Sequence, residues 1–188
     1  SRLMGIPTLI KTLTASDSAS LAFVDGTSDV VFDSTYDEYM FVFTDIGPAT
    51  DGADFQFQVN ATDDAGGGYD TSLITSTAFQ AYLTEANAEG FEYVDNEDIA
   101  NAASFQTLAR APGNGADESC AGILHIFSPA STTYVKHFYG RSHSYYQGDL
   151  ALSLFVGGYI NDTTAIDEIQ FKMDSGNFDG VIQMYGIA

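Results

Sequence analysis

The strongest pattern along this chain is an alternation of apolar and polar residues with a period of two, which predicts β-strands. It is clearest over residues 54–60. There, the apolar side chains at every second position should face a core, while Gln56 and Gln58 should point outward. Residues 54–60 therefore predict a strand that covers one side of a hydrophobic interior.

A second apolar run, residues 39–43, contains no charged or amide side chain and is typical of a strand covered on both faces. Residues 45–52, between the two runs, contain a Gly-Pro and an Asp-Gly pair, which favour a turn. We therefore predict that residues 39–43 and 54–60 form a β-hairpin.

Aromatic and β-branched residues recur in further short runs separated by polar turns, as expected for a sandwich or barrel. These runs predict strands over residues 9–13, 20–24, 71–76, 104–108, 123–128, 133–139, 150–156, 166–173 and 181–187. Only residues 77–88 fit a short helix, with an extended loop as the alternative. The acidic, weakly patterned residues 85–101 predict a long surface excursion. The fold prediction is a single all-β domain over residues 1–188, an antiparallel β-sandwich of the jelly-roll kind with at most one or two short helices.

Charge narrows the range of partners. The chain has 26 acidic and 6 basic residues, a net charge of −20, although only 17% of it is charged. Phosphate binding requires clustered Lys and Arg, so we expect no nucleic acid and no anionic membrane as partner. The longest apolar stretch, residues 150–160, is too short to cross a bilayer. Residues 1–14 lack a continuous apolar segment, so we expect no signal peptide.

One loop offers a candidate metal site. Asp63, Asp64 and Asp70 flank a triple glycine, and their carboxylates are calcium candidates because Ca²⁺ prefers oxygen ligands. The ligand spacing of an EF-hand is missing, and an ordinary hairpin loop is the favoured alternative. A second acidic group, Asp95, Glu97 and Asp98, is a weaker candidate. No cofactor is predicted.

The sequence contains no recognisable catalytic motif. Cys120 is the single cysteine, so an internal disulfide is excluded and a buried apolar role is expected. The sequence lacks a Gly-x-Ser-x-Gly elbow. His125 and His137 fall on predicted neighbouring strands without the short spacing of a zinc site. We predict no catalytic residue, although a facing pair of carboxylates for glycoside hydrolysis stays open among so many acids.

One stretch combines aromatic and polar side chains in a way that is typical of recognition surfaces. It contains Tyr139, Arg141, His143, Tyr145 and Tyr146. These five residues are predicted to form a rim used for recognition or for contact between subunits. Ordinary packing of a strand and its loop is the alternative.

Three segments resemble virion proteins of tailed phages, especially marine and cyanobacterial phages. They are residues 9–23 (LIKTLTAS and SLAF), residues 36–51 (YDEYMFVF and IGPATD) and residues 166–187 (IDEIQF, SGNF and GVIQMYGI). The resemblance covers about half of the chain and implies a jelly-roll or lectin-like sandwich. Physical reasoning agrees with it, since a closing strand at residues 181–187 can pair next to an N-terminal strand and remove sheet edges.

The resemblance implies a non-enzymatic structural protein on the outer surface of a virion. The leading expectation is a capsid decoration or cement protein, a homo-oligomer bound to other virion proteins such as the major capsid protein. The alternative is a tail or fibre-tip module that binds host surface glycans. A further alternative is a polysaccharide-degrading enzyme built on a sandwich fold.

Overall fold

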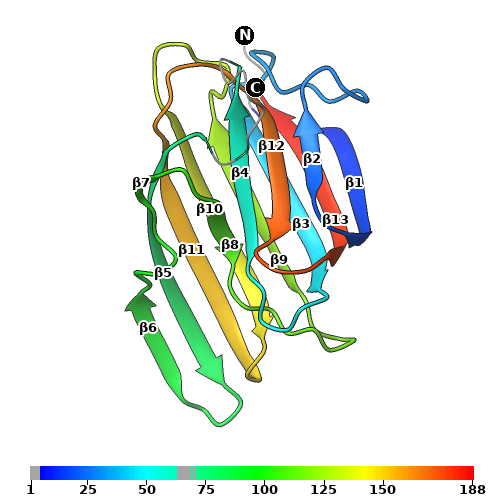
Figure 1. Cartoon of the computed structure of the whole chain (residues 1–188), viewed down its shortest axis with the longest axis vertical. Coiled ribbons are helices and arrows are strands. Elements are labelled where there is room, and N and C mark those ends of the chain that lie inside the picture. Colours follow the sequence, from blue (N-terminus) through cyan, green and yellow to red (C-terminus); the bar gives the residue numbers. More distant parts are fainter. Residues whose placement is uncertain (1–4, 63–68, 70) are drawn as a thin grey trace.

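Two antiparallel β-sheets pack face to face in the computed structural model, which describes residues 5–62, 69 and 71–188 (Figure 1). Sheet A has the order β1 (Thr8–Ser18), β13 (Phe178–Ile187), β3 (Glu38–Pro48), β9 (Cys120–Phe127), β10 (Lys136–Tyr146), β11 (Leu150–Ile160), β5 (Ile74–Thr84) and β6 (Glu89–Tyr93), and β7 (Ala100–Ala102) also pairs with β5. Sheet B has the order β2 (Leu21–Val24), β12 (Ile166–Met173), β4 (Phe55–Ala61) and β8 (Gln106–Ala109). The predicted all-β antiparallel sandwich is confirmed.

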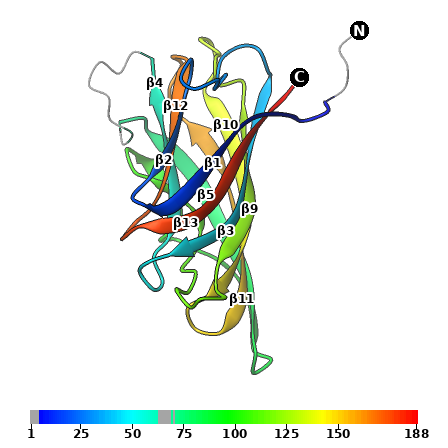
Figure 2. The same cartoon turned by 90° about the vertical axis from the view of Figure 1, so that its right-hand side faces the viewer.

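The chain crosses between the sheets at each of its first strands and again at its end. As a result β13 lies between β1 and β3 in sheet A, and β12 lies between β2 and β4 in sheet B. Figure 2 shows these two nested groups edge-on as adjacent layers. The predicted pairing of the last strand beside the first is confirmed, with Leu13 opposite Ile182. This wrapping is the kind expected of a jelly roll.

The predicted hairpin of residues 39–43 and 54–60 is wrong. The strand β3 pairs with β13 and β9 in sheet A, whereas β4 pairs with β12 and β8 in sheet B. Residues 49–54 instead carry the chain across the core. The crossing lets aromatic rings of β3 and β4 face each other, with Phe43 and Phe55 5.2 Å apart between centroids. Only one face of β3 is fully covered, because Met40 and Val42 on its other face are half-buried.

The predicted helix or loop at residues 77–88 is also wrong, since β5 is a strand from Ile74 to Thr84. It pairs along its whole length with β11 and, on its other side, with β6 and β7. The strand β6 lies in the region predicted as a surface excursion, and β7 begins at the end of that region. As Figure 1 shows, β5 and β6 extend sheet A beyond the edge of sheet B.

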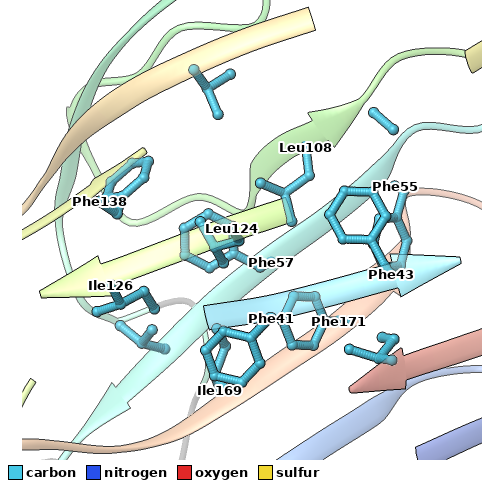
Figure 3. Close-up of a cluster of buried hydrophobic side chains, with 14 of the residues drawn as sticks. Phe41, Phe43, Phe55, Phe57, Leu108, Leu124, Ile126, Phe138, Ile169 and Phe171 are labelled. Atoms are coloured by element: carbon cyan, nitrogen blue, oxygen red, sulfur yellow. The ribbon is translucent and has the colours of Figure 1, made fainter. Parts of the chain in front are cut away.

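Aromatic rings from the two sheets fill the interior (Figure 3). Phe41 of β3 meets Phe171 of β12 at 5.4 Å, and Phe57 of β4 meets Phe138 of β10 at 5.3 Å between centroids. Cys120 is free and buried, as predicted, and burial raises the pKa of its thiol. This rigid layered core holds the outer face of sheet A in place.

Sheet B has a partly covered outer face. Gln58 points away from the core as predicted, but loops bury it completely. Its amide donates to the carbonyl oxygens of Ser72 at 3.2 Å and Ser104 at 2.8 Å.

Within the described part of the chain, no helix has the length and apolar character needed to cross a membrane.

Candidate binding groove on sheet A

An open groove of about 950 Å³ runs over the face of sheet A that points away from sheet B. It spans β3, β9, β10, β11 and β5, which are neighbours in the sheet. Its walls and floor include Thr77, Phe79, Tyr139, Arg141, Phe155 and Gly157. The groove lies over the centre of the sheet, where every strand is paired on both sides.

The strand β10 supplies the polar centre of the groove. Successive side chains of a strand point to opposite faces. In β10 this turns Tyr139, Arg141 and His143 outward, while Phe138 is directed into the core. These three outward residues belong to the predicted recognition rim, and the structure brings them together on the groove.

The other two residues of the predicted rim lie elsewhere. Tyr145 continues the outward face of β10 beyond the groove and donates to Asp149 Oδ1 at 3.2 Å. This hydrogen bond raises the pKa of Tyr145. Tyr146 is half-buried and packs against the hydrophobic core.

Two pairs of stacked rings flank the middle of the groove. His125 and Tyr139 stack with centroids 4.6 Å apart and planes at 20°. Phe79 and Phe155 stack at 5.0 Å and 5°. Tyr139 is 49% exposed and Phe79 is 38% exposed, so both rings present surface to a ligand.

Gly157 leaves a hollow in the floor. It lies opposite Tyr139 on one side and Thr77 on the other. A Cβ atom at this position would meet nothing closer than 3.9 Å. The missing side chain therefore opens a space beside the exposed ring of Tyr139.

A carboxylate next to the groove orients His125. Glu38 Oε1 lies 2.5 Å from Nδ1 of the imidazole. The carboxylate accepts, so Nδ1 carries the hydrogen and Nε2 is the remaining polar atom of the ring. Glu38 itself lies outside the groove lining.

The groove differs electrostatically from the rest of this acidic chain. Among the described residues that line it, none is Asp or Glu, while Arg141, His125 and His143 are present. Such a surface suits a ligand with hydroxyl groups and a flat apolar face, because rings can stack and polar side chains can form hydrogen bonds.

The predicted calcium candidates Asp63, Asp64 and Asp70 lie outside the described residues. Over residues 5–62, 69 and 71–188, no group of three His, Cys, Asp or Glu side chains is placed to hold a metal ion. In the second acidic group, Glu97 is buried and Arg110 Nε lies 3.4 Å from its Oε1. Asp98 accepts a hydrogen bond from Tyr93.

A second, polar pocket of about 500 Å³ lies between β4 and the segment that follows β6. Asp54, Glu97 and Thr107 line it. Burial, followed by the negative charge of Glu97, raises the pKa of Asp54 to about 7. Burial also raises the pKa of Glu97. Because Glu97 is paired with Arg110, we interpret this pocket as a buried charge network. It joins the segment after β6 to the segment after β8.

Sequence reasoning missed Phe79, Phe155 and Gly157. Phe79 lies in the stretch predicted as helix or loop, and the other two lie in a nearly continuous apolar run. One signal was available: three residues on one face of that run are small, namely Ala151, Ser153 and Gly157, which marks an outward face. Comparison of the chain with protein-family models, with curated proteins and with solved structures gives no match.

Proposed function

We propose that this chain is a non-enzymatic recognition module that binds a saccharide chain in the groove on sheet A. The observation that carries the proposal is the pairing of the exposed Tyr139 ring with polar donors around the hollow at Gly157. The Tyr139 ring accepts the C–H face of a sugar, the exposed part of Phe79 extends this apolar surface, and Arg141 and His143 meet the hydroxyl groups of the sugar.

The resemblance to phage virion proteins supports a place for this module on the outer surface of a particle, at a tail or fibre tip. There, a groove on the open face of a rigid sandwich would meet the glycans of a host cell. Binding without cleavage suits this role, because the bound saccharide serves as an attachment point.

Substitution of Gly157 tests the proposal. Native protein is first tested on a panel of neutral and acidic oligosaccharides, and each bound sugar is titrated by calorimetry. Gly157→Val fills the hollow and should weaken binding by at least about tenfold, equal to about 1.4 kcal/mol. Thr12→Val, on the outer face of the edge strand β1, is the matched control and should bind normally.

Three results would count against the proposal. The first is that the native protein binds no saccharide of the panel. The second is unchanged binding by the Gly157→Val variant. The third is recovery of shortened oligosaccharides after incubation, which would support the polysaccharide-degrading alternative.

A capsid decoration protein is the second candidate, and one observation favours it. The edge strand β6 and its neighbour β5 expose large apolar side chains, with Phe91 75% and Tyr93 55% exposed. Exposed apolar strips at a sheet edge favour association between copies. Fixed, high copy number on purified particle heads would support this candidate, whereas presence on tails in a few copies would reject it.

A further inference from the structure

We infer that the saccharide bound by this groove carries isolated acidic groups, and that Arg141 is the residue that recognises them. This inference rests on the proposed function and specifies the class of sugar. It follows from the position of Arg141, from the absence of a partner for it among the described residues and from the charge of the surrounding chain.

Arg141 lies at the centre of the groove. Ile123 is opposite it on β9 and Phe155 is opposite it on β11. Both neighbours are apolar, so the guanidinium group is flanked by surfaces that cannot satisfy its N–H donors. A guanidinium presents its donors as a planar fork that matches a carboxylate or a sulfate.

The other described cations are engaged, whereas Arg141 is not. Among the described residues none forms a hydrogen bond or ion pair with Arg141, and the side chain is exposed. The engaged cations are Arg110 with Glu97, Lys11 with the carbonyl of Ser28, Lys136 with the carbonyls of Asp162 and Thr164, and Lys172 over the ring of Phe105. In the part of the chain that the structure describes, Arg141 is therefore the open guanidinium, and it lies in a groove whose lining has no carboxylate.

The net charge of −20 limits how many acidic groups the ligand can carry. A dense polyanion would be repelled by the whole molecule, and salt screens that repulsion only beyond about 10 Å at 0.1 M. A single carboxylate or sulfate set between neutral sugars gains the contact with Arg141 and adds little repulsion. The inferred ligand is therefore a sugar chain whose acidic groups are spaced apart.

A pair of oligosaccharides that differ only at the acidic group provides the test. The probe is a hexasaccharide of alternating glucuronate and N-acetylglucosamine, and its partner is the carboxyl-reduced form of the same molecule. Calorimetry should give the acidic form a Kd at least about tenfold lower. Sulfated and desulfated galactan oligosaccharides form a second pair, which distinguishes a sulfate from a carboxylate as the recognised group.

Variants of Arg141 test whether this residue causes the preference for the acidic form. Arg141→Gln should remove it, leaving equal Kd values for the acidic and reduced forms. Arg141→Lys should keep part of it, because a lysine keeps the charge and loses the fork. Lys172→Gln makes the same change of net charge on sheet B, outside the groove, and should keep the full preference.

The outcomes separate this inference from the proposed function. If the neutral member of each pair binds as well as the acidic one, the saccharide module stands and the acidic ligand is rejected. If neither member nor any other saccharide binds, both fail. If Arg141→Gln instead changes the oligomeric state measured by sedimentation, a second copy of this chain occupies the groove and both are overturned.

Discussion

Phe57 of β4 meets Phe138 of β10 edge to face, with ring centroids 5.3 Å apart and planes at 82°. The two rings come from different sheets, so this contact joins the layers beneath the groove (Figure 3). Phe138 is the inward neighbour of Tyr139 on β10. The core and the groove therefore share one strand, with packing on one side and exposed chemistry on the other.

Phe138→Ala should destabilise the fold by about 3–5 kcal/mol, because it removes a buried ring and leaves a cavity between the sheets. Urea denaturation measures the change. Phe91→Ala is the matched control: its ring is 75% exposed, so the cost should be about 0.5 kcal/mol or less. Equal costs for the two variants would show that the Phe57–Phe138 contact does not hold the sheets together.

Alanine at two neighbouring glycines of β11 should affect the free energy of unfolding very differently. A Cβ on Gly157 would enter the groove with no atom nearer than 3.9 Å, whereas a Cβ on Gly158 would lie 2.8 Å from the Cα of Ser76 and collide with the carbonyl of Thr75. Gly157→Ala should change the free energy of unfolding by about 0.5 kcal/mol or less. Gly158→Ala should cost about 1–3 kcal/mol.

Thermal and urea unfolding of both glycine variants check this prediction. The pair is informative because both substitutions add the same methyl group to adjacent residues of one strand. A large loss of stability for Gly157→Ala would mean that the groove floor is packed, which would also undermine the hollow on which the proposed function depends.

Much of the sandwich could be predicted because aromatic residues alternate regularly in several strands. Residues 166–173 were predicted as a strand with the same bounds as β12. The pairing of the strands was harder to predict, because alternation indicates which side chains are buried but does not indicate which sheet buries them. This is why β3 and β4 seemed to be a hairpin although they face each other across the core.

Only residues 74–76 of β5 fell within a predicted strand, because polar side chains interrupt the inward face of the rest. Its inward face carries Ser76 and Gln80, and its outward face carries Phe79. The polar groups are satisfied by distant segments: Ser76 Oγ accepts from Ile99 N–H at 3.0 Å, and Arg110 donates to Gln80 at 2.8 Å. These partners are invisible in the local sequence. The groove was also hard to predict from the sequence, because only the part built by β10 has a local pattern of polar and aromatic residues.

Tyr39 anchors the loop between β2 and β3 from inside the core. Its hydroxyl donates to the carbonyl of Asp33 at 2.9 Å and accepts from the N–H of Asp33 at 3.0 Å. Tyr39→Phe should cost about 1–3 kcal/mol, because two hydrogen bonds worth about 0.5–1.5 kcal/mol each are lost. Urea denaturation measures the loss. Tyr134→Phe, at an exposed tyrosine, should leave stability unchanged, and equal effects for the two variants would contradict the anchoring role.

Asp54 links the start of β4 to the segment after β8, since its Oδ1 accepts a hydrogen bond from the N–H of Ala111 at 2.8 Å. Burial raises the pKa of Asp54 from 3.8 to about 7. The folded state therefore favours the protonated carboxyl. Its contribution to stability is fully present below about pH 4 and is lost as the pH rises through about 7.

Asp54→Asn should remove this dependence, because an amide keeps an oxygen acceptor for Ala111 and cannot ionise. The variant should be more stable than native protein at about pH 8, and the difference should shrink towards about pH 5. Urea denaturation at the two pH values measures it. Glu85→Gln removes an exposed acid elsewhere and should change stability equally at both pH values. An Asp54→Asn effect of the same size at both would mean that Asp54 is ionised throughout, with its charge compensated by Arg110.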